Sequence, residues 1–267
     1  LGEVVLFCRM KKKDVTIISN GFKGSRGEYE MMIRMGVSLF EFPVHSYREE
    51  VHDAQAGQQG ARHRAVGSVR AVKELGGDVV AVVVITALNY KDLPGTLAFI
   101  KELGLKRVML NRFNIGGQGI ADRGEVGLTN KQLREAFRLA NAAVRKFGLS
   151  ATSNVCTPFC VVDPSRHTSI GFSSCQPRET VRAWTLDPEG NIRFCNHSPV
   201  VAGNIYQNSF EEIISSEYLS QWREAVPDIC ADCDLYQRCW AGCRAASEQL
   251  GLPLTCADPI VYEEKKV

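Results

Sequence analysis

The placement of the cysteines constrains this chain more than any other feature of its sequence. Nine of the ten cysteines lie between Cys156 and Cys256, and Cys8 stands apart from them. In a secreted chain this density would suggest disulfides. The opening residues do not read as a secretory signal, and 267 residues with 45% hydrophobic content can build a core without covalent cross-links. Clustered cysteines then favour metal binding, and we expect a reducing, cytoplasmic location.

The remaining composition argues against several partners. A formal net charge of +2 is too close to neutral to indicate binding to nucleic acid or to an anionic membrane surface. No apolar run reaches the roughly 18 residues that a membrane span needs. The chain begins at Leu1 rather than at a methionine, and residues 1–12 already read as a helix within a fold. We therefore expect a fragment of a longer protein.

Strand and helix patterns alternate up to about residue 155. Residues 79–85, VVAVVVI, are apolar throughout, as expected of a strand that is buried on both faces. This alternation predicts an α/β fold with a parallel sheet, and such sheets bind ligands at the C-terminal ends of their strands. The expected strands are 15–19, 37–42, 79–85, 106–112 and 149–155, and the expected helices are 28–35, 64–75, 92–103 and 130–147.

Four of these strands end in polar or glycine-rich segments. The segment 112–119, RFNIGGQG, is the richest in glycine. Two interpretations remain open for it: its glycines let the backbone approach a ligand, or it is a plain flexible loop. The other strand ends are 19–21, 43–46 and 86–89.

The character of the sequence changes after residue 155, so we expect a domain boundary between residues 150 and 170. Residues 181–186 and 191–195 flank the turn segment Asp187–Gly190 and predict a β-hairpin. Residues 210–226 predict one or two short helices. The tryptophans of this half are expected to pack around it; they are Trp184, Trp222 and Trp240.

The sharpest motif is Cys230-x2-Cys233-x5-Cys239-x3-Cys243. A CxxC pair places two thiolates on one tight turn, and Cys239 supplies a third ligand. Cys256 is a candidate fourth ligand, because glycine and proline just before it let the chain turn back. Thiolate ligands suit iron–sulfur clusters and zinc alike.

Farther upstream, Cys175-x14-Gly190-x4-Cys195 completes a longer pattern with that motif and Cys256. The seven cysteines together resemble the signature of SPASM domains, which follow radical SAM (S-adenosylmethionine) cores in peptide- and protein-modifying enzymes. The flanking residues of Gly190 and Cys195 also resemble that family. The resemblance implies a small cysteine-rich α+β SPASM domain over residues 156–267.

The resemblance also implies a ligand scheme for two auxiliary 4Fe-4S clusters. Cys175, Cys195 and Cys243 would hold one cluster, whose fourth ligand varies in the family. Cys160 is our candidate for that position, an iron site open to substrate is the alternative, and Cys156 is favoured as a buried thiol. The other cluster would be held by Cys230, Cys233, Cys239 and Cys256.

Residues 1–155 resemble a partial radical SAM β/α barrel. The segment TIISNG at residues 16–21 is similar to the third strand of that core and its end, and residues 37–46 are similar to the fourth. From this resemblance we expect Asn20, Ser46 and Arg112 to contact S-adenosylmethionine. The end of the fourth strand, FPVHS at residues 42–46, departs from the family pattern. His52-Asp53 follows where such proteins often have this pair.

The chain contains no CxxxCxxC motif, the element that holds the catalytic cluster in the family. S-adenosylmethionine and a third 4Fe-4S cluster are therefore expected of the full-length parent, and Cys8 alone would not support cleavage of S-adenosylmethionine. The resemblance implies an oxidoreductase that modifies a peptide or protein by radical hydrogen abstraction and takes electrons from a reductant such as flavodoxin or ferredoxin. The auxiliary clusters would accept an electron or bind substrate; the catalytic residues are not identified.

Two alternatives remain beside this interpretation. The chain could be a non-catalytic scaffold for electron transfer or peptide binding, and zinc could occupy the thiolate sites. His197 is expected to bond a loop carbonyl rather than act as a ligand or an acid–base group.

Overall fold

The computed structural model describes residues 1–178, 180 and 182–265, and the chain divides into two compact units. The first unit comprises Leu1–Phe113, Glu135–Ser153 and Ser165–Gly171. The second comprises Asn114–Arg134, Asn154–Pro164 and Phe172–Val267. The glycine-rich loop after residue 113 therefore groups with the C-terminal residues.

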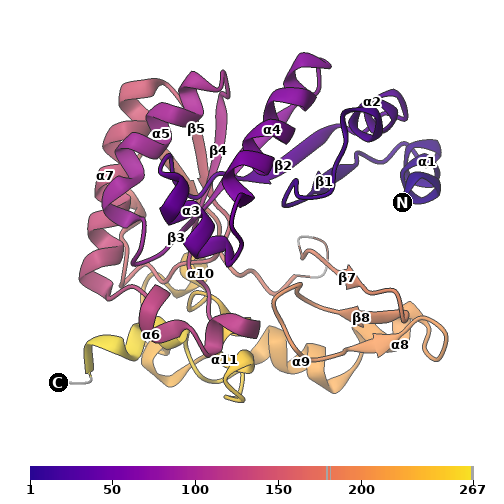
Figure 1. The fold of residues 1–267 in the computed structure, drawn as a ribbon. Coiled ribbons are helices and arrows are strands. Elements are labelled where there is room, and N and C mark those ends of the chain that lie inside the picture. The colour runs from indigo at the N-terminus through magenta and orange to yellow at the C-terminus, as the bar shows by residue number, and fades with distance from the viewer. Residues whose placement is uncertain (179, 181, 266–267) are drawn as a thin grey trace. The chain divides into compact units, whose positions relative to one another are not determined.

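A six-stranded sheet forms the centre of the first unit (Figure 1). Its strands lie in chain order, and β1 to β5 run parallel to one another. Representative register pairs are Phe40 with Val79 and Val108 with Ala151. The strands are β1 (Thr16–Ile18), β2 (Leu39–Pro43), β3 (Val79–Ile85), β4 (Arg107–Arg112), β5 (Ser150–Ser153) and β6 (Ile170–Phe172).

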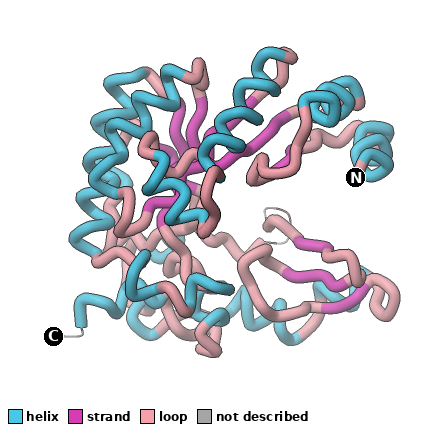
Figure 2. The backbone as a smooth tube through the Cα atoms, viewed as in Figure 1, coloured by secondary structure: helices cyan, strands magenta, loops and turns pink. Residues whose placement is uncertain are grey.

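Helices alternate with these strands (Figure 2), so the predicted α/β class with a parallel sheet is confirmed. The helix α4 contacts β2, β3, α2 and α3. The helix α3 was not anticipated from the sequence. The helices are α1 (Gly2–Met10), α2 (Arg26–Arg34), α3 (Glu49–Ala56), α4 (Ala61–Glu74), α5 (Leu93–Glu102) and α7 (Asn130–Phe147).

The core of the first unit is made of strand residues and the helices that cover them. Phe40, Phe42, Val83, Ile85 and Leu110 are completely buried. Burying one such side chain contributes roughly 1.5–3 kcal/mol relative to leaving it exposed. The continuous apolar run of β3 is explained by this burial, because both of its faces are covered.

A tight contact fixes the end of β1. Gly21 has a φ of 71°, and a Cβ on it would lie 2.7 Å from the Ser68 hydroxyl of α4. That hydroxyl donates to the Gly21 carbonyl at 3.2 Å and accepts from the Tyr29 hydroxyl at 2.8 Å. Glycine is required here by both the backbone angle and the close approach of α4.

The second unit has short elements and little regular structure. A three-stranded antiparallel sheet contains the predicted hairpin, and Val181 at its expected start lies outside the described residues. Its core is aromatic, with Phe194 and Trp222 completely buried. The elements are α6 (Arg123–Val126), β7 (Thr185–Leu186), β8 (Asn191–Arg193), β9 (Gly203–Asn204), α8 (Phe210–Ile214), α9 (Glu217–Glu224), α10 (Tyr236–Cys239) and α11 (Arg244–Gln249).

Within the described ranges, no helix combines the length and the apolar composition that crossing a membrane would require.

Candidate metal centres

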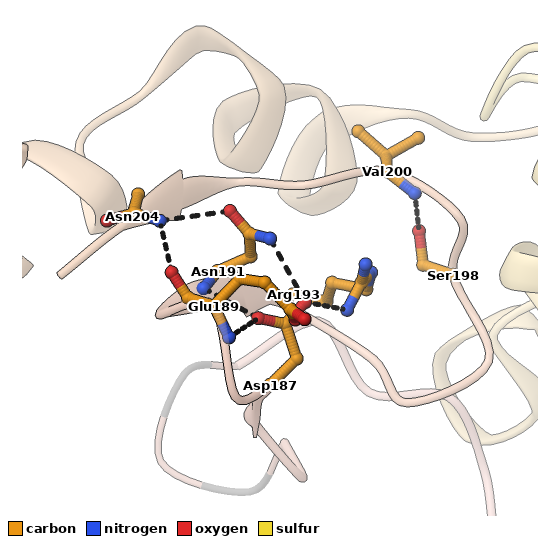
Figure 3. Close-up of polar contacts among 7 residues, drawn as sticks. All are labelled: Asp187, Glu189, Asn191, Arg193, Ser198, Val200 and Asn204. Carbon is orange, nitrogen blue, oxygen red and sulfur yellow. Dashed lines mark hydrogen bonds and ion pairs between the residues drawn. The ribbon is translucent and has the colours of Figure 1, made fainter.

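The hairpin that carries Cys195 is held by one carboxylate (Figure 3). Asp187 accepts hydrogen bonds from the backbone N–H groups of Glu189 and Asn191 at 3.1 and 2.9 Å, and from the Arg193 guanidinium at 2.9 Å. Desolvation works against the charged carboxylate, but these bonds prevail and hold the pKa of Asp187 below its ordinary value. The turn is thereby fixed, and its carboxylate also holds Arg193, two residues before Cys195.

Gly190 closes the same turn with a φ of 84°. A Cβ on it would lie 2.6 Å from the ring of Tyr206, so a larger residue would displace that ring. Asn204 of β9 donates to the carbonyl of Glu189 and the side-chain oxygen of Asn191, both at 3.0 Å (Figure 3). The glycine and the third strand together determine where the chain leaves the hairpin.

Four cysteines gather in the interior of the second unit, and we call them the inner thiol group: Cys156, Cys175, Cys195 and Cys243. The Cys156 thiol donates to Cys175, and both Cys175 and Cys243 influence its ionisation. Cys195 is electrostatically coupled to Cys175. Cys175 and Cys243 are buried, at 3% and 7% exposure.

Polar groups surround the sulfur atoms of the inner thiol group. The Arg182 guanidinium donates to Cys175 Sγ at 3.1 Å, and the Asn114 amide donates to Cys243 Sγ at 3.2 Å. The backbone N–H of Arg244 also donates to Cys175. Hydrogen bonds to sulfur stabilise thiolates and are among the features that set the properties of iron–sulfur clusters.

The ionisation of this group is uneven. The hydrogen bond from Cys156 opposes the desolvation of Cys175 and, with the Arg182 charge, lowers the pKa of the Cys175 thiol. The same hydrogen bond and burial raise the pKa of Cys156. Burial also raises the pKa of Cys195. Cys175 is thus prepared as a thiolate, the form that binds metals.

Another four cysteines form a second neighbourhood, the outer thiol group: Cys160, Cys230, Cys233 and Cys239. Burial and the neighbouring thiols Cys239, Cys233 and Cys160 raise the pKa of Cys230 to about 11. Burial, followed by the nearby Cys239, raises the pKa of Cys160. Two members, Cys160 and Cys233, are exposed.

The backbone around Cys239 is shaped to donate to its sulfur. The N–H of Phe159 lies 3.2 Å from Cys239 Sγ, and the N–H groups of Ala241 and Gly242 also donate to it. Trp240, Ala241 and Gly242 all have positive φ values, of 55°, 61° and 78°. Consecutive left-handed residues turn neighbouring N–H groups toward one acceptor, which here is the Cys239 sulfur.

The structure places Cys160 beside Cys239 and Cys233, not beside Cys175, Cys195 and Cys243 as the sequence led us to expect. Cys156, which the sequence analysis favoured as a buried thiol, neighbours Cys175 and Cys243 instead. In the described part of the chain, no three histidine, cysteine or acidic side chains stand ready to enclose a single metal ion. Each thiol group is therefore a set of neighbouring cysteines and not a closed coordination site for a single ion.

The glycine-rich loop contacts the region after Cys195. His197 Nε2 lies 2.7 Å from the Ile115 carbonyl, which is the loop-carbonyl contact expected for His197. Gln249 joins the same segments, because it accepts from the Gly117 N–H at 3.3 Å and donates to the His197 carbonyl at 2.6 Å. A Cβ on Gly116 would lie 2.6 Å from the His197 ring. The glycine at position 116 thus serves close packing.

Of the three residues expected to contact S-adenosylmethionine, Asn20 and Ser46 follow β1 and β2, and Arg112 is the last residue of β4, so they lie along one edge of the parallel sheet. Asn20 is exposed, and its side chain accepts from the Phe22 N–H at 3.0 Å. Ser46 is completely buried and accepts from the Arg48 N–H at 3.1 Å. Arg112 is 3% exposed and donates to the Phe113 carbonyl. The contact with a cofactor remains a prediction.

Two stacked histidines lie at this edge, with ring centroids 5.0 Å apart. His45 Nδ1 accepts from the Val84 N–H at 3.2 Å, and His52 Nδ1 accepts from the His45 N–H at 3.1 Å. Burial, with the neighbouring His52, lowers the pKa of His45 to about 3, and burial lowers that of His52 to about 4. Both rings are therefore neutral at pH 7. Asn89 completes the edge by donating to the carbonyls of His45 and Val84, both at 2.8 Å.

Several site residues were missed from the sequence. Arg182 lies at an unspecified position within the Cys175-x14-Gly190 spacing, and nothing in the local sequence distinguishes it. Arg244 directly follows Cys243, and it is completely buried while donating to the Trp222 carbonyl at 2.6 Å and the Tyr236 hydroxyl at 2.7 Å. A charged residue directly after a motif cysteine is the sequence signal that could have identified Arg244. Asn114 lies in the glycine-rich loop, where the sequence pattern pointed to the glycines and not to this amide.

Known proteins match this chain at two scales, over part of the second unit and over nearly the whole length. A family model described as SPASM, an iron–sulfur cluster-binding domain, matches residues 175–234. Among curated relatives, the PqqA peptide cyclase of Gluconobacter oxydans (strain 621H) is 22% identical over 272 residues, covering 97% of this chain and 72% of that protein. The PqqA peptide cyclase of Xanthomonas campestris pv. campestris (strain 8004) is 21% identical, covering 97% and 69%.

Solved structures share the fold. Streptococcus suis SuiB superposes with a TM-score of 0.75 at 15% identity, covering 97% of this chain and 63% of that one. Native anSMEcpe with bound AdoMet and Cp18Cys peptide has a TM-score of 0.72 at 12% identity, covering 98% and 76%. SuiB bound to the precursor peptide SuiA has a TM-score of 0.74 at 14% identity, covering 97% and 61%.

Proposed function

The chain is a radical SAM/SPASM protein without the CxxxCxxC motif, and on that premise we propose that the full-length parent of which it is the C-terminal part modifies a peptide or protein substrate by radical hydrogen abstraction. The observation that carries the proposal is the separation of the SPASM cysteines into two thiol neighbourhoods, in a chain whose first unit contains a parallel β/α sheet. The name of the similar PqqA peptide cyclases describes action on a peptide. Two of the similar solved structures contain bound peptides. We assign residues 1–155 to a partial radical SAM barrel and residues 156–267 to the SPASM domain.

We propose that the inner thiol group holds one 4Fe-4S cluster through Cys175, Cys195 and Cys243, with Cys156 as the fourth ligand. The fit rests on the donors aimed at these sulfurs, since Arg182 and Asn114 bond to them within 3.2 Å. The proposal replaces Cys160 by Cys156, because Cys156 donates to Cys175.

A second 4Fe-4S cluster would be held by Cys230, Cys233, Cys239 and Cys256. The backbone donors to Cys239 fit a sulfur ligand. Cys160 lies in the same neighbourhood and is the alternative fourth ligand to Cys256. Thiol-based ligation suits a reducing compartment, so the proposal places the protein in the cytoplasm.

When bound, S-adenosylmethionine and its own 4Fe-4S cluster would supply the carbon-centred radical, and the SPASM clusters would exchange electrons or bind substrate. Asn20, Ser46 and Arg112 at the strand ends are our candidates for contact with S-adenosylmethionine. The neutral ring of His52 orders the segment that carries Ser46, because its Nδ1 binds the His45 N–H. An external one-electron reductant such as flavodoxin or ferredoxin completes the proposal.

The first test is the metal content of the chain after anaerobic reconstitution. We expect about eight iron atoms and a matching amount of sulfide per chain, from two 4Fe-4S clusters. A brown absorbance should accompany them. Stoichiometric zinc with negligible iron would contradict the proposal and would favour a zinc-binding scaffold.

The ligand scheme is tested by single substitutions. Cys156→Ala and Cys243→Ala should each remove about half of the iron and spare the outer cluster, whereas Cys256→Ala should spare the inner one. The two clusters can be distinguished by electron paramagnetic resonance after reduction. Cys8→Ala is the matched control, because Cys8 lies in α1 of the first unit and should leave the iron content unchanged. Cys160→Ala with loss of the inner cluster would restore the original expectation.

A further inference from the structure

Arg182 is a cation placed against the inner thiol group. Its Nη1 lies 3.1 Å from Cys175 Sγ, and its Nε donates to the Phe194 carbonyl at 3.4 Å. The guanidinium also lies over two aromatic rings, 5.1 Å from the centroid of Phe194 and 4.9 Å from that of Trp222. Because both rings are completely buried, they form a fixed surface that orients the guanidinium toward the sulfur.

The charge of Arg182 reaches beyond Cys175. It also acts on Cys195 and Cys156, so one cation influences three of the four inner thiols. Asn114 adds an amide donor to the fourth, Cys243. Every sulfur of the inner thiol group is therefore influenced by a positive charge or by the positive end of a dipole.

The outer thiol group has a different environment. Its sequence places Asp228, Asp232 and Asp234 around Cys230 and Cys233, and all three aspartates are exposed. The donors to Cys239 are backbone N–H groups, which carry no net charge. A cation is thus hydrogen-bonded to a sulfur of the inner thiol group, whereas the outer one has exposed aspartates beside it in sequence and the charge of the buried Arg244 acting on Cys230.

We propose that Arg182 raises the reduction potential of the inner cluster, so that it is the more easily reduced of the two SPASM clusters. The inference rests on the proposed function, since it requires clusters at both thiol groups. Reduction adds one negative charge to a cluster, and a nearby cation stabilises the reduced form more than the oxidised form. Partial burial strengthens that interaction, because the effective dielectric constant is lower than in water.

The test is a redox titration of the reconstituted protein monitored by electron paramagnetic resonance, with Arg182→Met and Arg182→Lys as variants. Methionine keeps the length and apolar contact of the side chain and removes its charge. Lysine keeps the charge but lacks the planar fork that stacks on the rings and bonds to sulfur. The matched control is Arg238→Met, which removes an exposed arginine next to Cys239.

We expect the inner cluster of the wild type to be reduced at the higher potential. Arg182→Met should shift that cluster to a more negative potential and leave the outer cluster unchanged, and Arg182→Lys should give a smaller shift. If Arg182→Met instead loses the inner cluster while Arg182→Lys keeps it, a more negative inner-cluster potential in Arg182→Lys than in the wild type supports the inference, and an unchanged one contradicts it. Iron content and spectra report each of these results without any activity assay.

Unchanged potentials in a fully loaded Arg182→Met protein would overturn the inference. Equal loss of the inner cluster in both Arg182 variants would also overturn it, because packing rather than charge would then explain the role of Arg182. A wild-type protein that takes up no iron would refute the proposed function itself. The iron content of the wild type is therefore measured before any variant is compared.

Discussion

The two units of this protein are stabilised in different ways. The first buries aliphatic and aromatic side chains on long helices and a continuous sheet, and residues such as Leu97, Leu110 and Phe137 are completely buried. The second has helices of four to eight residues and strands of two or three, too short to fold on propensity alone. The difference teaches that regular secondary structure can be replaced by specific polar contacts and sulfur ligands.

The polar contacts of the second unit join residues far apart in the sequence. Arg244 binds the Trp222 carbonyl, and the Tyr218 hydroxyl donates to Glu248 at 2.7 Å. Such contacts depend on position, whereas apolar burial tolerates repacking. The second unit should therefore respond more strongly than the first to loss of a single constraint.

The largest expected effect is the response of the second unit to iron removal. Structural metal sites contribute on the order of 10 kcal/mol to folding. Chelation of the reconstituted protein under reducing conditions should therefore abolish amide protection in β8 and α9. Protection in β3 and β4 should persist, because their burial involves no metal. Hydrogen exchange with and without iron provides the measurement, and equal loss in both units would break the comparison.

A core truncation in the sheet should show the opposite selectivity. Leu110→Ala removes a completely buried side chain from β4 and should cost about 2–5 kcal/mol of unfolding free energy. The loss should be the same with and without iron. Denaturant titration followed at the first unit measures it, with exposed Leu88→Ala as the control. A loss that depends on iron would show that the two stabilities are linked.

Acid should weaken the first unit through its two buried histidines. Their folded pKa values are about 3 and about 4, below the ordinary value of 6.5, so the unfolded chain binds more protons between those values. Stability is therefore complete above about pH 6.5 and falls as the pH decreases toward 4, by up to about 1.4 kcal/mol per pH unit for each imidazole. His52→Asn keeps an acceptor for the His45 N–H and should flatten this dependence. An unchanged pH profile in that variant would contradict the assignment.

The smallest expected effects come from matched helix caps. Ser25 begins α2 in the first unit and Ser209 begins α8 in the second, and both form a complete capping box with a glutamate three residues later. Ser25→Ala and Ser209→Ala should each cost about 1 kcal/mol. Hydrogen exchange should locate each loss in its own unit. Loss of iron in Ser209→Ala but not in Ser25→Ala would sharpen the comparison further.

The sequence predicted the first unit well because hydrophobic periodicity reports burial directly. The run of β3 was located at both ends, and β4 and α7 were placed within one residue. The helix α3 was missed, since its eight residues, EEVHDAQA, have little apolar periodicity. Its C-terminal Gly57 has a φ of 64°, a stop signal that the sequence did contain.

The candidate site was only partly predictable. Cysteine spacing indicated which thiols to propose as ligands, but spacing does not say which thiol lies beside which in space. Cys156 and Cys160 differ by one helical turn in sequence and lie in different neighbourhoods, because Cys156 meets Cys175 while Cys160 meets Cys239. Arg182 was missed because its role depends on the rings of Phe194 and Trp222, which only the tertiary structure brings together.

The bond between Cys243 and Asp258 has a consequence for the order of biosynthesis. The backbone N–H of Cys243 donates to Asp258 Oδ2 at 2.8 Å, across 15 positions of sequence. A ribosome makes Cys243 before the carboxylate that orients its backbone, and Cys256 also emerges after the cysteines with which it is assigned. On the proposed ligand scheme, a cluster would therefore enter the finished geometry only after this segment has been translated. Until Asp258 has been made, the backbone N–H of Cys243 lacks the acceptor that it has in the folded protein.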